Sequence, residues 1–131
     1  MRQKAETLAQ IEIFDWIRTQ PRIAKVAFHV PNEGRRSFYY GKILKEMGMK
    51  RGVSDICIPI ARPGYHGLFI ELKAKNKRGK YNTATENQMR FIRDMQFEGY
   101  YACICNGAAE AIDKIKWYIA SLSTDNKIIK S

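Results

Sequence analysis

One alternating stretch near the middle of the chain decides the fold: GLFIELKA, residues 67–74. Its even-numbered positions are all apolar, whereas the charged residues Glu71 and Lys73 occupy odd positions. A period of two is that of a β-strand with one buried face. The pattern predicts a strand over residues 65–74, in which Glu71 and Lys73 project together from the face opposite the core.

A second strand is predicted just before the first, over residues 55–60. Residues 61–64 (ARPG) have the composition of a hairpin connection between the two strands. The isoleucines of the earlier strand share one face, and Asp55 opens the other. If the strands pair as this pattern indicates, Asp55, Glu71 and Lys73 converge at one end of the sheet.

Helices and strands also alternate along the rest of the chain. Residues 83–97 form a predicted helix that Thr83 caps, with Glu86 completing a capping box. The other predicted helices cover residues 4–19, 37–47 and 108–122, and the other predicted strands cover residues 25–30 and 100–105. The order α-β-α-β-β-α-β-α predicts a single α/β domain over residues 1–122, a mixed central sheet flanked by helices, followed by a polar tail at residues 123–131.

The chain is strongly basic. Its 131 residues include 23 Lys and Arg against 13 Asp and Glu, which gives a formal net charge of +10. Such an excess indicates a polyanionic partner, nucleic acid before an anionic membrane surface. No apolar run approaches the roughly 18 residues that span a bilayer, and the first residues lack the apolar region of a secretory signal. We therefore expect no membrane partner.

The chain has three cysteines, an odd number in a sequence for which we expect no export signal. Disulfide frameworks are typical of secreted proteins, so a reducing, cytoplasmic setting is expected instead. Cys57, Cys103 and Cys105 lie in apolar runs. We interpret them as packing residues rather than zinc ligands.

Two carboxylates and a lysine at one end of a sheet make chemical sense as a metal site. Asp55 and Glu71 could bind a hard cation such as Mg²⁺ through oxygen, and such a cation lowers the pKa of bound water and neutralises charge on a phosphate. Lys73 could orient the attacking water or stabilise the transition state. A surface ion pair between Glu71 and Lys73 beside a solvated Asp55 fits the same spacing and contributes little free energy.

Two further polar residues lie on apolar faces of predicted helices. Gln88 shares a stripe with Ile92, and a core-facing glutamine requires hydrogen-bond partners that a metal site would supply. Glu12 lies on the row formed by Leu8 and Trp16, from which it could reach the site as a third carboxylate. The alternatives are a stripe-border Gln88 that reaches solvent and an ordinary half-exposed Glu12.

These residues match a known signature. Asp55, Glu71 and Lys73 resemble the D…(D/E)-x-K pattern of the PD-(D/E)XK nucleases. The resemblance narrows to the VRR-NUC (virus-type replication-repair nuclease) family through three segments: HVPNEGR at residues 29–35, GMKRGVSD at residues 48–55 and HGLFIELK at residues 66–73. It extends over residues 6–119 and departs from the family pattern at Ser54, where a proline is common.

The resemblance implies a PD-(D/E)XK core and a role for each central residue. The metal ligands would be Asp55, Glu71 and the backbone carbonyl of Leu72. Lys73 would be the catalytic lysine, and Gln88 would be a supporting residue of the site.

Other residues are assigned to the surroundings of the site. Glu12 would be the acidic residue of the N-terminal helix and a further candidate metal ligand. His29 and Asn32 would lie near the DNA path, although a strand-end histidine and a turn asparagine fit them equally well. Two basic clusters are expected to bind the DNA backbone by charge rather than by base sequence. They comprise Arg35, Arg36, Lys42, Lys45, Lys50 and Arg51 before Asp55, and Lys75, Lys77, Arg78 and Lys80 after Glu71.

The resemblance implies a Mg²⁺- or Mn²⁺-dependent endonuclease that hydrolyses phosphodiester bonds in branched DNA. Family members act on four-way junctions or on flaps, and single-domain members similar to this chain are typically phage or bacterial proteins. One site cuts one strand, so symmetric cleavage of a four-way (Holliday) junction requires two sites related by a two-fold axis, hence a homodimer. A junction resolvase is the leading hypothesis. A flap nuclease and a non-catalytic DNA-binding protein that retains the fold are the alternatives.

Overall fold

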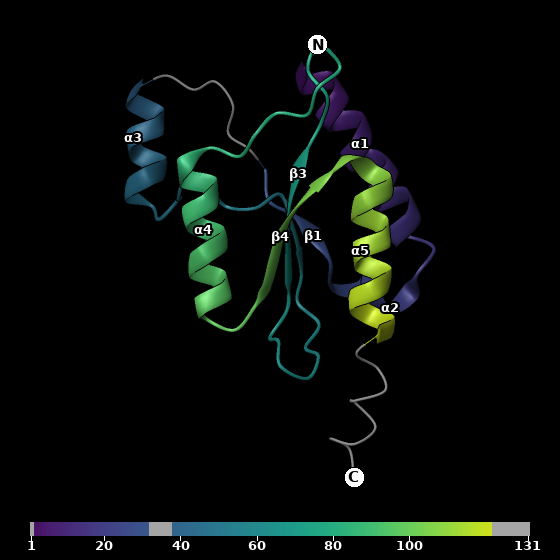
Figure 1. The fold of residues 1–131 in the computed structure, drawn as a ribbon. Helices are drawn as coiled ribbons and strands as arrows, with labels where there is room; N and C mark the ends of the chain where they lie inside the picture. The colour runs from purple at the N-terminus through teal and green to yellow at the C-terminus, as the bar shows by residue number, and fades with distance from the viewer. Residues whose placement is uncertain (1, 32–37, 122–131) are drawn as a thin grey trace.

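The computed structural model describes residues 2–31 and 38–121 (Figure 1). This part of the chain forms a four-stranded mixed sheet flanked by helices, which confirms the predicted α/β class. Asn32, Arg35, Arg36 and the polar tail at residues 123–131 lie outside the described residues. The elements are α1 (Arg2–Ile17), α2 (Pro21–Val26), β1 (Phe28–His29), α3 (Phe38–Glu46), β2 (Ile56–Ile58), β3 (Leu68–Lys73), α4 (Glu86–Phe97), β4 (Tyr101–Asn106) and α5 (Gly107–Ser121).

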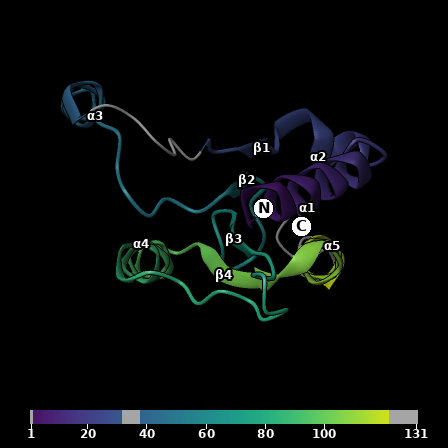
Figure 2. The ribbon, with the colours of Figure 1, turned by 90° about the horizontal axis from the view of Figure 1, so that it is seen from above.

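The strands follow one another in the order β1-β2-β3-β4. The β1/β2 and β2/β3 pairs are antiparallel, and β3 and β4 are parallel, with Ile70 opposite Ile56 and Glu71 opposite Ile104. Seen along the sheet, α1 and α5 lie on one side and α4 lies on the other (Figure 2). The predicted hairpin therefore forms, and β3 occupies the middle of the sheet.

The main core lies between the sheet and helices α1 and α5. The alternation in β3 is as predicted, because its even-numbered side chains are buried in this core. The Tyr118 hydroxyl donates a hydrogen bond to the carbonyl of Ile60 at 2.8 Å, which satisfies the polar end of a fully buried ring. Each buried isoleucine or leucine contributes roughly 1.5–3 kcal/mol to folding. The largest contributors are Ile13, Ile17, Ile56, Ile58, Leu68, Ile70 and Ile115.

The predicted strand over residues 25–30 is mostly wrong. Pro21 opens an additional helix, α2, that continues through Val26, and only Phe28 and His29 form β1. Proline suits the first turn of a helix because its φ is already helical and it needs no N–H partner there. Ile23 is buried in the core, which favours the helix over an extended chain. The element order therefore carries one helix more than predicted.

Helix α4 begins later than predicted, and Thr83 is not its cap. Thr85 is the N-cap: its hydroxyl accepts a hydrogen bond from the backbone N–H of Gln88 at 3.2 Å, and the Gln88 side chain accepts one from the N–H of Thr85 at 2.8 Å. Thr83–Glu86 and Thr85–Gln88 have the same spacing, so the sequence offers two capping boxes. The later one forms, and it places Gln88 in the first turn of α4.

Candidate active site

Three charged side chains meet where β2 begins and β3 ends. Asp55 is the residue before β2, and its Oδ2 atom accepts a hydrogen bond from the backbone N–H of Leu72 at 2.7 Å. Glu71 Oε2 lies 3.7 Å from Lys73 Nζ. Glu71 is 3% exposed and Lys73 is 5% exposed, so their ion pair is not a solvated surface contact. The alternation of side chains along β3 and its pairing with β2 thus bring Asp55, Glu71 and Lys73 together.

The two carboxyl groups strongly perturb each other. Burial, followed by the negative charge of Asp55, raises the pKa of Glu71 to about 8, and the charge of Lys73 offsets only part of this rise. Burial also raises the pKa of Asp55, against the hydrogen bonds from Leu72 and Glu71. Two carboxylates at such close range cannot both ionise freely without a compensating positive charge. Alone, the pair retains a proton near neutral pH.

Gln88 connects the site to α4. Its Oε1 atom accepts a hydrogen bond from Lys73 Nζ at 2.7 Å and another from the N–H of Thr85 at 2.8 Å. The same side chain therefore completes the helix cap and orients the buried lysine. Gln88 therefore faces the site rather than solvent.

On α1 it is Glu6, rather than the exposed Glu12, whose charge affects Glu71, as the smallest of the effects that raise its pKa. Glu6 lies seven and eleven residues before the buried Ile13 and Ile17, a spacing that keeps all three on one helix face. This periodicity points to Glu6, whereas the row of Leu8 and Trp16 points to Glu12.

Comparisons with known proteins agree with this geometry. No protein-family model and no curated protein matches the chain. A solved structure described as a "VRR_NUC domain protein" matches with a TM-score of 0.76 and 30% sequence identity, over 90% of this chain and 89% of that chain. The chain belongs to the VRR_NUC family. The resemblance stated from the sequence is confirmed, and membership implies a nuclease, hence a hydrolase with DNA as its substrate.

The oxygen donors of this VRR_NUC site suit a hard divalent cation. Glu71 Oε1 is buried and has no hydrogen-bond partner among the described residues, so it is an acceptor that a cation would satisfy. A cation would also relieve the repulsion that raises the pKa of Glu71. Within residues 2–31 and 38–121, no group of three His, Cys, Asp or Glu side chains is arranged to hold a metal. The donor set offered is two carboxylates, with the Leu72 carbonyl as the expected third.

His29 supports the backbone of Asp55. The Asp55 carbonyl accepts a hydrogen bond from the N–H of Val30 at 2.7 Å, and His29 Nδ1 lies 3.0 Å from the same oxygen. The exposed His29 ring therefore lies beside the site, at the end of β1. Its partner in the sequence-based assignment, Asn32, falls outside the described residues.

Gly52 lets the segment before Asp55 pack against α4, a contact that the sequence did not reveal. It adopts a positive φ of 85°, and a Cβ atom there would overlap the backbone carbonyl of Asn87 in the first turn of the helix. Ser54 is fully buried and its hydroxyl finds no hydrogen-bond partner in the described part of the chain, so it fills the position of the common proline as a packing residue. This close packing fixes Asp55 relative to Gln88.

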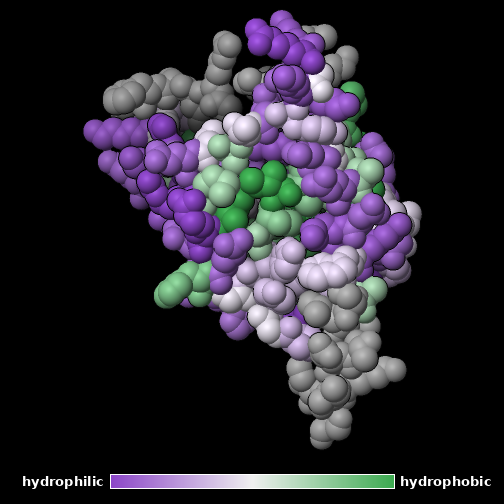
Figure 3. Space-filling view, in the orientation of Figure 1, coloured by the Kyte–Doolittle hydropathy of each residue, from purple (hydrophilic) through white to green (hydrophobic). Residues whose placement is uncertain are grey.

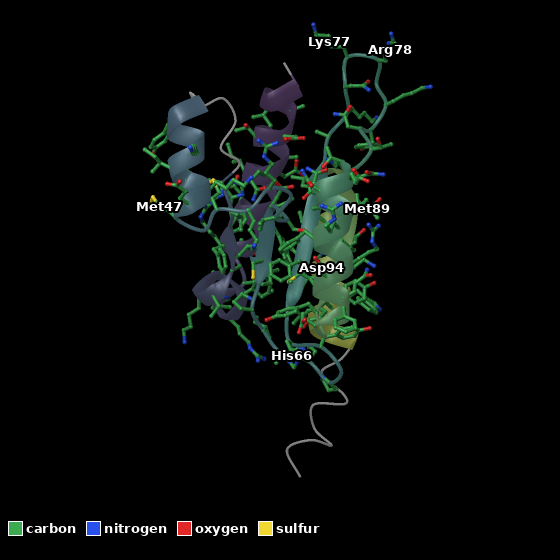
Figure 4. The ribbon with its side chains drawn as sticks, turned by 90° about the vertical axis from the view of Figure 1, so that its left-hand side faces the viewer. Met47, His66, Lys77, Arg78, Met89 and Asp94 are labelled. Atoms are coloured by element: carbon green, nitrogen blue, oxygen red, sulfur yellow. The ribbon has the colours of Figure 1, made fainter. Side chains whose placement is uncertain are left out.

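The cations after β3 are carried by a loop that is closed by hydrogen bonds to Asn76. The Asn76 side chain accepts hydrogen bonds from the N–H groups of Arg78 at 2.9 Å and Lys80 at 3.1 Å. Lys77 and Arg78 extend from the tip of this loop at one end of the molecule, opposite the end where His66 lies (Figure 4). The described cations of both predicted clusters, including Lys50 and Arg51, are exposed.

Among the described residues, no helix has the length and apolar character needed to cross a membrane.

Proposed function

We propose that this chain is a metal-dependent, structure-selective DNA endonuclease that hydrolyses phosphodiester bonds in branched DNA. The observation that carries the proposal is the buried Glu71 carboxyl beside Asp55: one of its oxygens has no partner within residues 2–31 and 38–121, and the other lies 3.7 Å from Lys73 Nζ. Burying these groups together destabilises the protein unless they serve a ligand. A divalent cation and a phosphate supply the charges that this arrangement lacks.

Each residue has a distinct part in the proposed reaction. Asp55 and Glu71, with the Leu72 carbonyl, would hold Mg²⁺ or Mn²⁺. Such a cation, when bound, acidifies water and neutralises charge on the phosphate. Lys73 is held by Gln88 within hydrogen-bond range, so its ammonium group is positioned to orient the attacking water and to stabilise charge that develops on the phosphate.

We propose a four-way (Holliday) junction as the preferred substrate and a homodimer as the active form. Symmetric cleavage of a junction needs two sites related by a two-fold axis. The exposed cations would contact phosphates, which carry charge but no base identity, so this surface favours selection by DNA shape.

The substrate is tested by a cleavage panel on labelled DNA: a four-way junction, a flap, a splayed arm and a linear duplex, each with Mg²⁺, with Mn²⁺ and with EDTA. We expect metal-dependent nicking of the junction at symmetric positions and little cleavage of the linear duplex. Preferential cleavage of the flap would identify a flap nuclease of the same family. Binding without cleavage of any substrate would identify a DNA-binding protein that retains the fold.

The loop after β3 has its own testable consequence. Replacing Lys77 and Arg78 by alanine is expected to weaken junction binding and to reduce the slope of log affinity against log salt by about 1.8, because each lost phosphate contact accounts for about 0.9. Titrations over a range of salt concentrations measure this slope. Arg22 and Lys25 are exposed cations on α2, and their double alanine variant is the matched control. An unchanged slope in the Lys77/Arg78 variant would remove this loop from the DNA surface.

A further inference from the structure

Two thiols lie side by side on β4. Cys103 and Cys105 are two residues apart in the strand, so their side chains share one face, and their Sγ atoms are 3.9 Å apart. At this separation one thiol donates a hydrogen bond to the other. Two strand residues place the Cα atoms about 6.6 Å apart, within the range of about 4.4–6.8 Å that a disulfide bridges. The two thiols can therefore join within the strand.

The two thiols differ in exposure. Cys105 is fully buried in the core, whereas Cys103 is half-buried at its edge. Cys103 also lines a hollow of about 540 Å³ along β4, together with Tyr101 and Ile104. Apolar side chains gather at the same place, between α4 and α5 (Figure 3). A small uncharged reagent can therefore reach Cys103 from this hollow, whereas Cys105 is closed to solvent.

The surroundings favour the thiolate of Cys103 over that of Cys105. The hydrogen bond from Cys105 lowers the pKa of Cys103, and the charge of Lys114 on α5 acts in the same direction, against burial and the charge of Glu110. The same hydrogen bond, followed by burial, raises the pKa of Cys105. Thiolates rather than thiols react with peroxides. Cys103 is therefore the nucleophile of the pair, and Cys105 keeps its proton until the second step.

The third cysteine has neither a neighbouring thiol nor a favoured thiolate. Cys57 lies on β2 and is buried, and burial raises its pKa to about 11. Its register partners are Phe28 and Phe69. Cys57 is therefore an internal reference for a thiol that is only buried.

We propose that Cys103 and Cys105 are a peroxide-reactive dithiol that closes to a reversible disulfide within β4 and thereby weakens the candidate metal site. In the first step Cys103 Sγ attacks one oxygen of hydrogen peroxide, the O–O bond breaks, and a sulfenic acid forms as water leaves with the Cys103 proton. In the second step Cys105 Sγ attacks the Cys103 sulfur, the S–O bond breaks, and the hydroxyl leaves as a second water with the Cys105 proton. The two thiols lose two electrons, which reduce the peroxide.

The backbone of both cysteines faces β3. The N–H of Tyr101 donates to the carbonyl of Gly67, directly before β3, at 2.9 Å, and every second residue of a strand repeats this direction. Cys103 and Cys105 therefore direct their backbone groups toward β3, on either side of Ile104. The disulfide would act on the pairing of these two strands.

Closure displaces the part of β4 beside the candidate metal ligands. Glu71 is the register partner of Ile104, and Leu72 is that of Cys105. Most disulfides hold their Cα atoms about 5.5–6 Å apart, so closure shortens β4 here by roughly 0.6–1.1 Å. Groups that support metal ligands from outside contribute about 10- to 100-fold in metal affinity. In this respect the inference rests on the proposed function, because the loss concerns the metal that Glu71 and Leu72 would hold.

The first test maps the disulfide in the full chain. The protein is treated with hydrogen peroxide, remaining thiols are alkylated under denaturing conditions, and tryptic peptides are weighed before and after dithiothreitol. Cys103 and Cys105 share the peptide of residues 94–114, whereas Cys57 lies in that of residues 52–73. We expect the first peptide to be two hydrogens lighter and unalkylated until it is reduced, and Cys57 to be alkylated throughout. A pair that stays reduced, or a Cys57 that reacts as fast, would overturn the proposal.

Serine variants assign the order of the steps. Cys105→Ser removes the second thiol, so Cys103 should accumulate as a sulfenic acid, which dimedone traps. Cys103→Ser removes the nucleophile, and its Cys105 should react at least about 10-fold more slowly, because a buried thiol stays protonated. Cys57→Ser is the matched control and should form the disulfide at the wild-type rate. Thermal melting checks that each variant is folded. Oxidation of Cys105 in Cys103→Ser at the wild-type rate would contradict the assignment of the nucleophile.

The second test measures Mn²⁺ binding, through its effect on thermal melting, for reduced protein and for oxidised protein freed of peroxide. Oxidation should weaken Mn²⁺ binding by about 10-fold or more, and reduction of the disulfide should restore it. The Cys103→Ser/Cys105→Ser double variant, treated alongside, controls for oxidation elsewhere in the chain and should bind Mn²⁺ equally before and after peroxide.

The two tests keep this inference separate from the proposed function. Oxidised protein that binds Mn²⁺ as tightly as reduced protein would overturn the link to the metal site. Reduced protein that binds no Mn²⁺ and cuts no DNA would reject the proposed function and that link, whereas the mapped disulfide would stand. Reduced protein that cuts DNA but forms no Cys103–Cys105 disulfide would reject only the dithiol.

Discussion

Replacing Glu71 by glutamine is expected to abolish DNA cleavage and, in the absence of metal, to make the protein more stable. The first effect follows from the loss of a metal ligand: metal stabilisation of the reaction is worth several kcal/mol, so cleavage should fall on the order of 10³-fold or more. The second follows from burial, because Glu71 is 3% exposed and faces Asp55. A neutral amide of the same shape removes that repulsion.

The sign of the pH dependence follows from the raised pKa of Glu71. Its folded value of about 8 lies above its ordinary value of 4.5, so the folded state holds a proton that the unfolded state releases in this range. The free energy of unfolding of metal-free wild type should therefore fall as the pH rises from about 4.5 to about 8. Above about pH 8, Glu71 should add no further pH dependence. Glu71→Gln should lose most of this dependence, and its advantage should be largest at pH 8.

Thermal denaturation in EDTA and in Mn²⁺ measures both effects. Mn²⁺ should raise the melting temperature of wild type, because it binds the folded state, and should have much less effect on Glu71→Gln. Glu12→Gln is the matched control, an exposed carboxylate on α1 that should change neither cleavage nor melting. A Glu71→Gln variant that melts below wild type at pH 8 in EDTA would contradict the electrostatic account of this site.

Replacing Lys73 by methionine is expected to lower the cleavage rate by roughly 10²–10⁴-fold, the range for a lost proton-transfer or charge-stabilising group. Methionine keeps much of the apolar stem but removes the ammonium that Gln88 and Glu71 hold at 2.7 Å and 3.7 Å. Junction binding should be nearly unchanged, because Lys73 is 5% exposed and adds little to the outer surface.

Single-turnover cleavage and DNA titration separate these two quantities for Lys73→Met. Lys116→Met serves as the control for loss of a lysine elsewhere on the surface. If Lys73→Met bound DNA weakly and cleaved what it bound at the wild-type rate, Lys73 would be a DNA contact and not a catalytic group.

The centre of the site was predictable from the sequence because it depends on which side chains of a strand share one face. Alternation in residues 67–74 places Glu71 and Lys73 on one face, and the hairpin with β2 brings Asp55 alongside, whatever the details of the loops. Register is strongly specified where one face is buried, since a shift of one residue would expose the whole apolar set. Gln88 was predictable for a similar reason, as a polar residue on an apolar helical stripe.

Other features depend on contacts that local patterns do not encode. Residues 25–30 are rich in strand formers, yet Pro21 and the burial of Ile23 extend a helix into them. Thr85 rather than Thr83 caps α4, and its capping partner Gln88 also binds Lys73 of β3. The position of the cap therefore depends on a contact between two elements. A glycine is needed at position 52 because the backbone of Asn87 lies against it. Glu6 is the exception, since its spacing from Ile13 and Ile17 was visible in the sequence.

The most direct test of the central claim is cleavage of a labelled four-way junction by wild type and by Asp55→Ala, with binding measured on the same DNA. Wild type is expected to nick the junction with Mg²⁺ or Mn²⁺ and to be inactive in EDTA. Asp55→Ala should bind the junction about as tightly and leave it uncut. Absence of cleavage by wild type with either metal, or metal-dependent cleavage by Asp55→Ala at the wild-type rate, would contradict the assignment of this site as a nuclease centre.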